Sequence, residues 1–179
     1  MKRYAALLIG CLLIFSIAGP DALGLSLNKS KVFEPDQLLS EAEAAKLVGI
    51  PKISLDRDSL EVDTETGTSD TRYVYDIPGG TLLALFHLVQ NGAIAKANIM
   101  NGSAAKEWDF CYAQLKDESD ILSGLGDKAF YYKSYSRVYV LYGNYFFMIA
   151  FKSPTEDESK DRDINIAIAR HIIENIKQK

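Results

Sequence analysis

The N-terminal segment is the feature that most constrains this chain. Residues 4–18 contain no charged side chain and follow directly after Lys2 and Arg3. As a helix, this stretch would span roughly 22 Å at about 1.5 Å per residue, which is shorter than a hydrocarbon core of about 30 Å. A basic start followed by a compact apolar run is typical of a secretory signal peptide. We therefore predict that residues 1–24 are a signal peptide or membrane anchor, with a mature start near Leu25.

Two alternatives to simple cleavage stay open. Leu8-Ile9-Gly10-Cys11 resembles a bacterial lipobox, in which Cys11 would be lipidated after cleavage. The segment could also be retained as an anchor that leaves the following domain outside the membrane. A packed surface helix would show a polar face, and residues 4–18 have none. In each case we expect an extracellular or cell-envelope protein that contacts the membrane only through this segment.

The composition of the remaining chain excludes some partners. Removal of residues 1–24 takes Lys2, Arg3 and Asp21 from the 20 basic and 24 acidic side chains, which leaves a net charge of about −5. Without clustered Lys and Arg, a nucleic-acid-binding surface is not expected. Of the two cysteines only Cys111 remains, so no intramolecular disulfide can form and stability has to come from burial.

Turn and capping residues divide the rest of the chain into elements. Residues 25–37 are expected to form an extended tether, and residues 38–179 a single domain. Ser40 and Glu43 fit a capping box at the start of a helix that Gly49 would end. Alternating and apolar runs then predict strands, with further helices from 103 to 115 and after an acidic loop at 154–163. The expected strands are 60–64, 71–77, 81–89, a fourth at 93–100, then 130–132, 137–142 and 145–151.

This order is α, three or four strands, α, three strands, α. Runs of neighbouring antiparallel strands separated by helices indicate an α+β fold in which helices pack on an antiparallel sheet.

The residue types that most often carry catalysis give weak patterns. Cys111 lies on the apolar stripe of its predicted helix, where a buried core cysteine is expected. His87 and His171 are far apart and lack metal-ligand spacing, so each is interpreted as a buried or rim side chain, and neither a metal nor a cofactor is predicted. A joint site of His87, Cys111 and an Asp stays open as the basis of an envelope hydrolase. Gly124-Leu125-Gly126-Asp127-Lys128 is expected to be a turn, because a phosphate-binding loop would precede a helix.

Tyrosines crowd the predicted hairpin near residues 130–147. Tyrosine is favoured both in strands and at recognition surfaces, so two interpretations remain: cross-strand packing, or an exposed patch that contacts a peptide, a glycan or a partner protein. Asn28 and Asn101 each begin an Asn-X-Ser tripeptide and are candidate glycosylation sites. The candidate contact residues are Tyr131, Tyr132, Tyr135, Tyr139 and Tyr142.

Three stretches together carry a resemblance: residues 38–49, Gly124-Leu125-Gly126-Asp127-Lys128-Ala129-Phe130, and Val138-Tyr139-Val140-Leu141-Tyr142-Gly143-Asn144. They resemble small exported, mycobacterial-type lipoproteins of uncharacterised function, some of which have folds like the PsbP proteins of the photosystem oxygen-evolving complex. Such proteins often carry a Cys before the tyrosine-containing strand, where this chain has Thr71-Arg72-Tyr73, so the resemblance implies no shared disulfide. It implies no catalytic activity either.

The sequence therefore favours an exported, non-enzymatic module that binds an unknown protein or small ligand at the cell surface. An envelope hydrolase with a site assembled from distant residues is the second hypothesis. A structural subunit of a larger surface assembly is the third.

Overall fold

The computed structural model describes residues 33–63, 68–77, 80–90, 103–153 and 157–179, and for residues 57–90 it describes the backbone alone. Within these ranges, seven strands form one antiparallel sheet in the order β1-β2-β3-β7-β6-β5-β4. Its strands are β1 (Ser54–Asp63), β2 (Thr68–Ile77), β3 (Gly80–Gln90), β4 (Ser119–Ile121), β5 (Lys128–Tyr132), β6 (Arg137–Tyr142) and β7 (Tyr145–Ala150).

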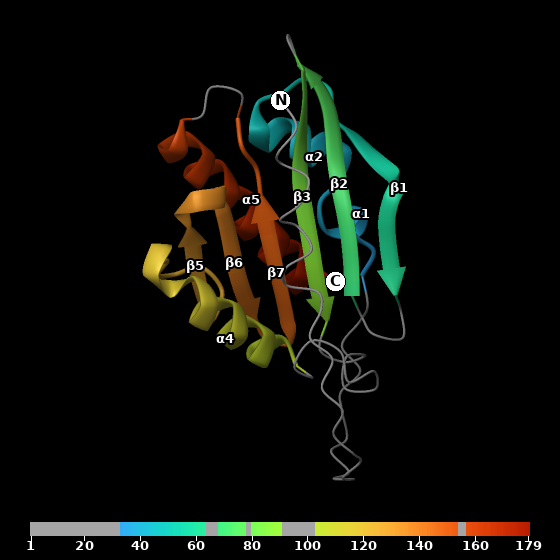
Figure 1. Ribbon diagram of the computed structural model, residues 1–179. Coiled ribbons are helices and arrows are strands. Elements are labelled where there is room, and N and C mark those ends of the chain that lie inside the picture. The colour runs from blue at the N-terminus through green and yellow to red at the C-terminus, as the bar shows by residue number, and fades with distance from the viewer. Residues whose placement is uncertain (1–32, 64–67, 78–79, 91–102, 154–156) are drawn as a thin grey trace.

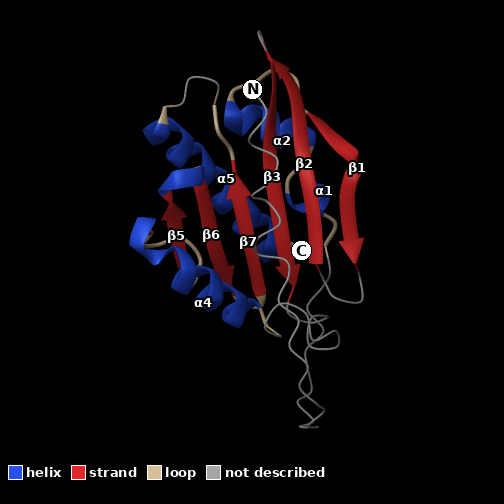
Figure 2. Ribbon diagram, in the orientation of Figure 1, coloured by secondary structure: helices blue, strands red, loops and turns tan. Residues whose placement is uncertain are grey.

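Helices cover both faces of this sheet. In Figures 1 and 2, α4 lies in front of β5, β6 and β7, whereas α1, α2 and α5 lie behind the sheet. The predicted α+β class with helices packed on an antiparallel sheet is confirmed. The helices are α1 (Pro35–Leu38), α2 (Glu41–Val48), α4 (Ala104–Leu115) and α5 (Glu158–Gln178), with short 3-10 turns η2 (Lys116–Glu118) and η3 (Lys133–Tyr135).

The first long helix begins and ends as its sequence predicts. The Ser40 hydroxyl accepts a hydrogen bond from the Glu43 N–H, and the Glu43 carboxylate accepts one from the Ser40 N–H at 2.8 Å. Gly49 ends α2 in the left-handed conformation, at φ 72°. Interactions between residues close in sequence therefore define both ends of α2.

Several boundaries differ from the predictions, and β1 already begins at Ser54, six residues before its predicted start. Phe33 is buried and its ring lies 5.9 Å from that of Tyr145, so residues 33–37 belong to the folded domain rather than to a tether. The predicted loop at 154–163 is shorter, because Asp157 accepts a hydrogen bond from the Lys160 N–H and α5 already starts at Glu158. Glu158 and Asp161 stand in the first turn of that helix, where carboxylates interact favourably with the macrodipole.

Some predictions fall outside the described residues. These are the N-terminal segment 1–24, the strand at 93–100, and the glycosylation candidates Asn28 and Asn101. Within the described ranges, no helix has the length and apolar character needed to cross a bilayer.

Two hydrophobic clusters lie on opposite faces of the sheet. The larger one joins α1, α2 and α5 to the sheet, and the smaller one lies under α4 around Trp108 and Phe130. Neighbouring residues of a strand point to opposite faces, so each strand of the hairpin β6–β7 contributes to both clusters. The larger cluster takes Val138, Val140, Phe147 and Ile149, and the smaller takes Tyr139, Leu141, Phe146 and Met148.

Candidate functional site

The candidate contact tyrosines do not share one surface. Tyr131 and Tyr142 pack on the α5 side of the sheet, whereas Tyr132 and Tyr139 pack on the α4 side. Tyr135 lies in η3, between β5 and β6, and is 45% exposed. Strand alternation separates these residues, because adjacent positions of β5 face opposite ways.

Tyr131 and Tyr139 are core residues, which corrects their assignment to a contact patch. Tyr139 is 6% exposed, and its ring stacks on that of Phe130 at 4.6 Å. Tyr131 is 1% exposed, and its hydroxyl donates to Ser136 Oγ at 3.4 Å. Burial raises the pKa of Tyr131, and the nearby carboxylates of Glu158 and Asp161 raise it further, so its hydroxyl remains protonated and structural.

Tyr132 and Tyr135 lie at the surface. They contact a third residue, Arg137, which the sequence did not identify as a candidate. Their rings stack at 5.6 Å, and the Arg137 guanidinium lies 5.0 Å from the centre of the Tyr135 ring. We call these three residues the tyrosine–arginine surface. Arg137 stands two positions before Tyr139, and that spacing places it on the α4 face of β6 and could have identified it.

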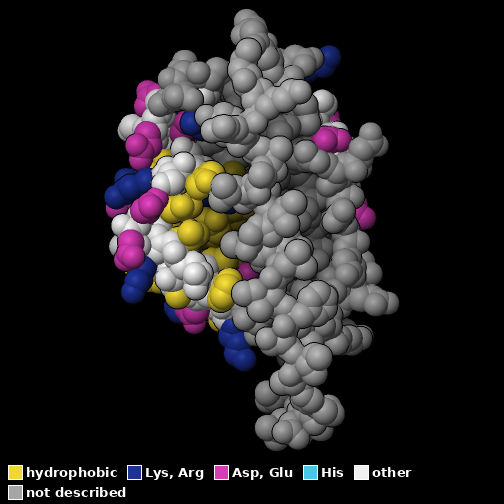
Figure 3. All heavy atoms as spheres, in the orientation of Figure 1, with side chains coloured by type: hydrophobic (Ala, Val, Ile, Leu, Met, Phe, Trp, Pro, Cys, Tyr) yellow, Lys and Arg dark blue, Asp and Glu magenta, His cyan; other side chains and the backbone are white. Residues whose placement is uncertain are grey.

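The tyrosine–arginine surface adjoins an apolar area of the same face. Figure 3 shows hydrophobic side chains gathered over β5, β6 and β7 beside α4. Beneath them runs a series of rings in contact, in which Trp108 stacks on Tyr112 at 5.1 Å and Tyr112 lies 5.3 Å from Phe130. Lys128 Nζ lies 4.9 Å from the centre of the Trp108 ring, on the outer side of the series.

The turn that carries Tyr135 is held from the other side of the sheet. Ser136, which follows Tyr135, is buried and adopts a positive φ of 49°, a conformation that costs a non-glycine residue free energy. Asn165 of α5 is fully buried, and its Nδ2 donates to the Ser136 carbonyl oxygen at 2.9 Å. The exposed tyrosine therefore projects from a turn whose backbone is fixed by the core.

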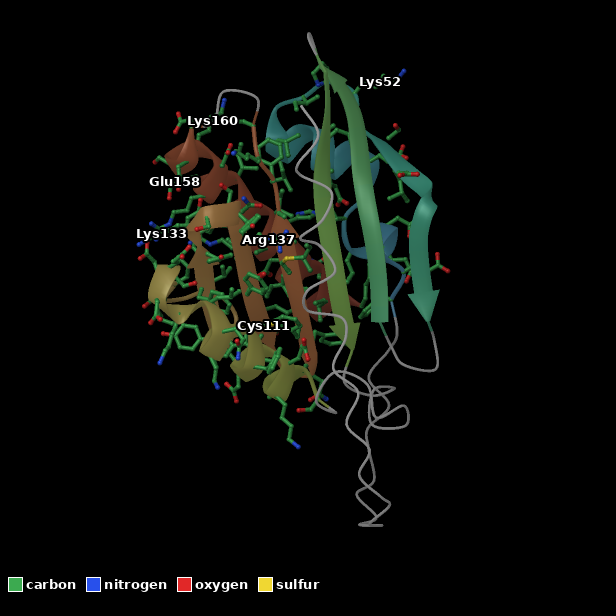
Figure 4. All side chains as sticks on the ribbon, viewed as in Figure 1. Lys52, Cys111, Lys133, Arg137, Glu158 and Lys160 are labelled. Carbon is green, nitrogen blue, oxygen red and sulfur yellow. The ribbon has the colours of Figure 1, made fainter. Side chains whose placement is uncertain are left out.

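A charged cluster lies on the other, α5 side of the sheet. Asp120 stands there opposite Tyr131 in register, and Arg162 lies 5.3 Å from the centre of the Tyr131 ring. The third member of the cluster is Lys133 of η3, labelled in Figure 4. Lys133 and Arg162 both pair with Asp120, at 2.7 Å and 3.4 Å. The hydrogen bond from Lys133 is the main reason that the pKa of Asp120 lies below its usual value. Within the described part of the chain, Nε of Arg137 and Nε1 of Trp108 are buried and donate no hydrogen bond. A buried donor without an acceptor is costly, and both of these lie on the α4 side.

Cys111 is partly buried on α4, and its Sγ lies 3.8 Å from Glu107 Oε1. His171 is on α5, across the sheet from Cys111, so these two residues cannot form a catalytic pair. His87 pairs in register with Met148, and its side chain lies outside the described residues. The joint His87–Cys111 site therefore stays a prediction. Among the described residues, no three His, Cys, Asp or Glu side chains are grouped so that they could hold a metal ion.

His171 instead links the two helices α2 and α5. Its Nε2 lies 3.0 Å from Glu43 Oε1 and 3.0 Å from Asn175 Nδ2. Partial burial raises the pKa of Glu43, but hydrogen bonds from Ser40 and the interaction with His171 outweigh it and the pKa falls below its usual value. Glu43 thus serves both the cap of α2 and the contact between the helices.

This arrangement predicts a stability that depends on pH. Because the pKa of Glu43 is lower in the folded chain than in the unfolded chain, its contribution is complete above the unfolded value near 4.5 and is lost as the pH falls through the folded value. We expect Glu43→Gln to cost roughly 0.2–1 kcal/mol at pH 7, since the carboxylate is partly exposed. Thermal unfolding from pH 7 to pH 3 measures this, and the difference between variant and wild type should shrink towards pH 3. A constant difference would contradict it.

Comparisons with protein-family models, curated proteins and solved structures give no match to this chain. The resemblance to exported lipoproteins with PsbP-like folds therefore stays a prediction. Function has to be inferred from the arrangement of the side chains.

Proposed function

We propose that this chain is an exported binding module that holds a partner protein at the tyrosine–arginine surface, with no chemistry of its own. The observation that carries the proposal is Tyr135, a large aromatic side chain that is 45% exposed on a turn fixed by the core. Export rests on the predicted signal segment, residues 1–24.

The position of Tyr135 favours binding over packing. Its ring contacts both the Tyr132 ring, at 5.6 Å, and the Arg137 guanidinium, at 5.0 Å, so little side-chain freedom remains to be lost when a partner binds. Tyrosine and arginine are among the residues that contribute most to binding energy at protein interfaces. A preorganised aromatic–cation pair beside an apolar area has the composition of an interface centre.

Arg137 indicates the chemistry of the partner. Its guanidinium is partly buried, and Nε has no acceptor in the described part of the chain. Nε itself is too deeply buried for a partner to reach, but a carboxylate of the partner would accept charge-assisted hydrogen bonds from the terminal N–H groups of the guanidinium. Lys128 and Lys133 are already paired with Asp109 and Asp120, so among the described residues Arg137 supplies the uncompensated positive charge of this surface. We therefore expect the partner to present an acidic residue next to an apolar or aromatic one.

Capture of the partner from the producing cells tests this function. We expect Tyr135→Ala and Arg137→Gln each to weaken capture about thirtyfold or more, as loss of an interface hot spot worth about 2 kcal/mol does. Phe110→Ala is the matched control, because Phe110 is 41% exposed on α4 and belongs to no described aromatic stack. The melting temperatures of the variants show whether each still folds. Equal capture by all four proteins would contradict the proposal, and a partner that dissociates only on denaturation would favour a structural subunit.

A further inference from the structure

The glycine-containing turn that precedes β5 forms one wall of a second site. A groove of about 470 Å³ lies between this turn, at Gly124–Gly126, and the outer side of α5. Tyr142 lines the groove from the end of β6, and the largely buried side chains of Leu125 and Ile173 form its floor. Its size is within the range of small-molecule sites, about 300–1,000 Å³. It lies on the α5 side of the sheet, away from the tyrosine–arginine surface.

The turn is fixed to the hairpin β6–β7. The Asp127 N–H donates to the Leu141 carbonyl oxygen at 2.8 Å, and Asp127 Oδ2 accepts from the Gly143 N–H at 2.7 Å. Gly126 lies so close to Leu141 that a Cβ atom would be 2.5 Å from its carbonyl oxygen. The groove therefore has one preformed wall, which lowers the entropy cost of binding.

The other wall carries two cations. Arg170 and Lys177 are seven residues apart on α5, so they lie two turns apart on one side of the helix. Lys177 Nζ pairs with Glu174 at 2.7 Å and lies 5.8 Å from the centre of the Tyr142 ring. Arg170 is exposed and, in the described part of the chain, forms no hydrogen bond or ion pair. Its guanidinium thus retains all its donors at the rim of the groove.

We infer that this groove binds an organic anion, whose carboxylate or phosphate group is held by the Arg170 guanidinium and whose apolar or aromatic body lies against Tyr142 and Leu125. A guanidinium suits either anion because it offers two parallel N–H donors. Lys177 adds little net attraction, because the Glu174 carboxylate compensates its charge. Glu174, already paired with Lys177, disfavours anions that carry charge at both ends.

Phenyl phosphate and phenylacetate are suitable probes because they share the ring and differ in the anion. We expect a titration of the full-length chain, followed by NMR, to shift the amide signals of Gly124 and Gly126 with at least one of them. Phenol, which lacks the anion, should shift them far less. Inorganic phosphate, which lacks the ring, should bind at least tenfold more weakly than phenyl phosphate.

Arg170→Gln is expected to weaken binding of the anion about ten- to a hundredfold, as loss of a charge-assisted hydrogen bond does. Lys160→Gln is the matched control, since it removes one positive charge from an exposed site nearer the start of α5. The inference is supported if Lys160→Gln binds the anion as tightly as the wild type does while Arg170→Gln binds it more weakly. Equal affinity in both variants, equal shifts with phenol, or equal affinity for inorganic phosphate would overturn it.

Discussion

Asn165→Ala is expected to lower the free energy of unfolding by about 2–4 kcal/mol. Asn165 is fully buried; its Oδ1 accepts from the Phe151 N–H at 2.8 Å, and its Nδ2 donates to the carbonyl oxygens of Ser136, Phe151 and Asp161. Alanine removes all four of these hydrogen bonds, and each buried group that is left without a partner costs about 1–3 kcal/mol. Chemical denaturation at pH 7 measures the loss.

Asn175→Ala is the matched control on the same helix. Asn175 is only partly buried, and its Nδ2 donates to the Leu38 carbonyl oxygen at 2.9 Å. We expect this variant to lose about 1 kcal/mol, the usual net value of one hydrogen bond. Because Asn165 also holds the Ser136 backbone, Asn165→Ala should in addition weaken partner capture. Equal stability of the two alanine variants would contradict the role assigned to Asn165.

Gly126→Ala is expected to destabilise the chain by roughly 2–4 kcal/mol. Gly126 has a φ of 62°, where an L side chain costs about 1–2 kcal/mol. The added Cβ would also lie 2.5 Å from the Leu141 carbonyl oxygen and 2.8 Å from Val140 Cγ1, and overpacking of this kind costs a further 1–3 kcal/mol. The turn and the hairpin can separate only by breaking the Asp127 hydrogen bonds.

Gly124→Ala separates the cost of the positive φ from the cost of the steric clash. Gly124 has a φ of 72°, but no atom lies within 4 Å of the position that its Cβ would take. The free energy of unfolding of this variant should therefore fall only by the conformational cost of the positive φ, about 1–2 kcal/mol. Thermal unfolding of both variants gives the comparison. If Gly124→Ala were as destabilising as Gly126→Ala, close packing of the turn against β6 would not explain why position 126 requires glycine.

Much of the fold could be predicted because its determinants are local. The capping box at Ser40, the end of α2 at Gly49 and the hairpin turn at Gly143-Asn144 depend on neighbours in sequence, and the structure confirms all three. The strand β4 (Ser119–Ile121) could not be predicted. It has three residues without an apolar alternation, and pairing with β5 alone defines it.

The site was predicted less well because it depends on contacts between distant residues. A tyrosine-rich hairpin indicates sheet packing and recognition equally, and the pattern does not show that Tyr135 lies on the exposed turn η3 whereas Tyr139 lies within β6, under α4. The clamp from Asn165 to Ser136 joins residues 29 positions apart. No local pattern predicts that a polar residue of an amphipathic helix will be fully buried. No sequence pattern singles out Arg170 either, because only the fold places it opposite the glycine-containing turn.

Photo-crosslinking in the producing cells tests the central claim most directly. A photoreactive phenylalanine analogue at position 135 should form one dominant protein adduct, because that position would lie inside the interface. The same analogue at position 110, which has a similar exposure on α4, should form little of that adduct. Identical adducts from both positions, or none from position 135, would show that the tyrosine–arginine surface holds no partner.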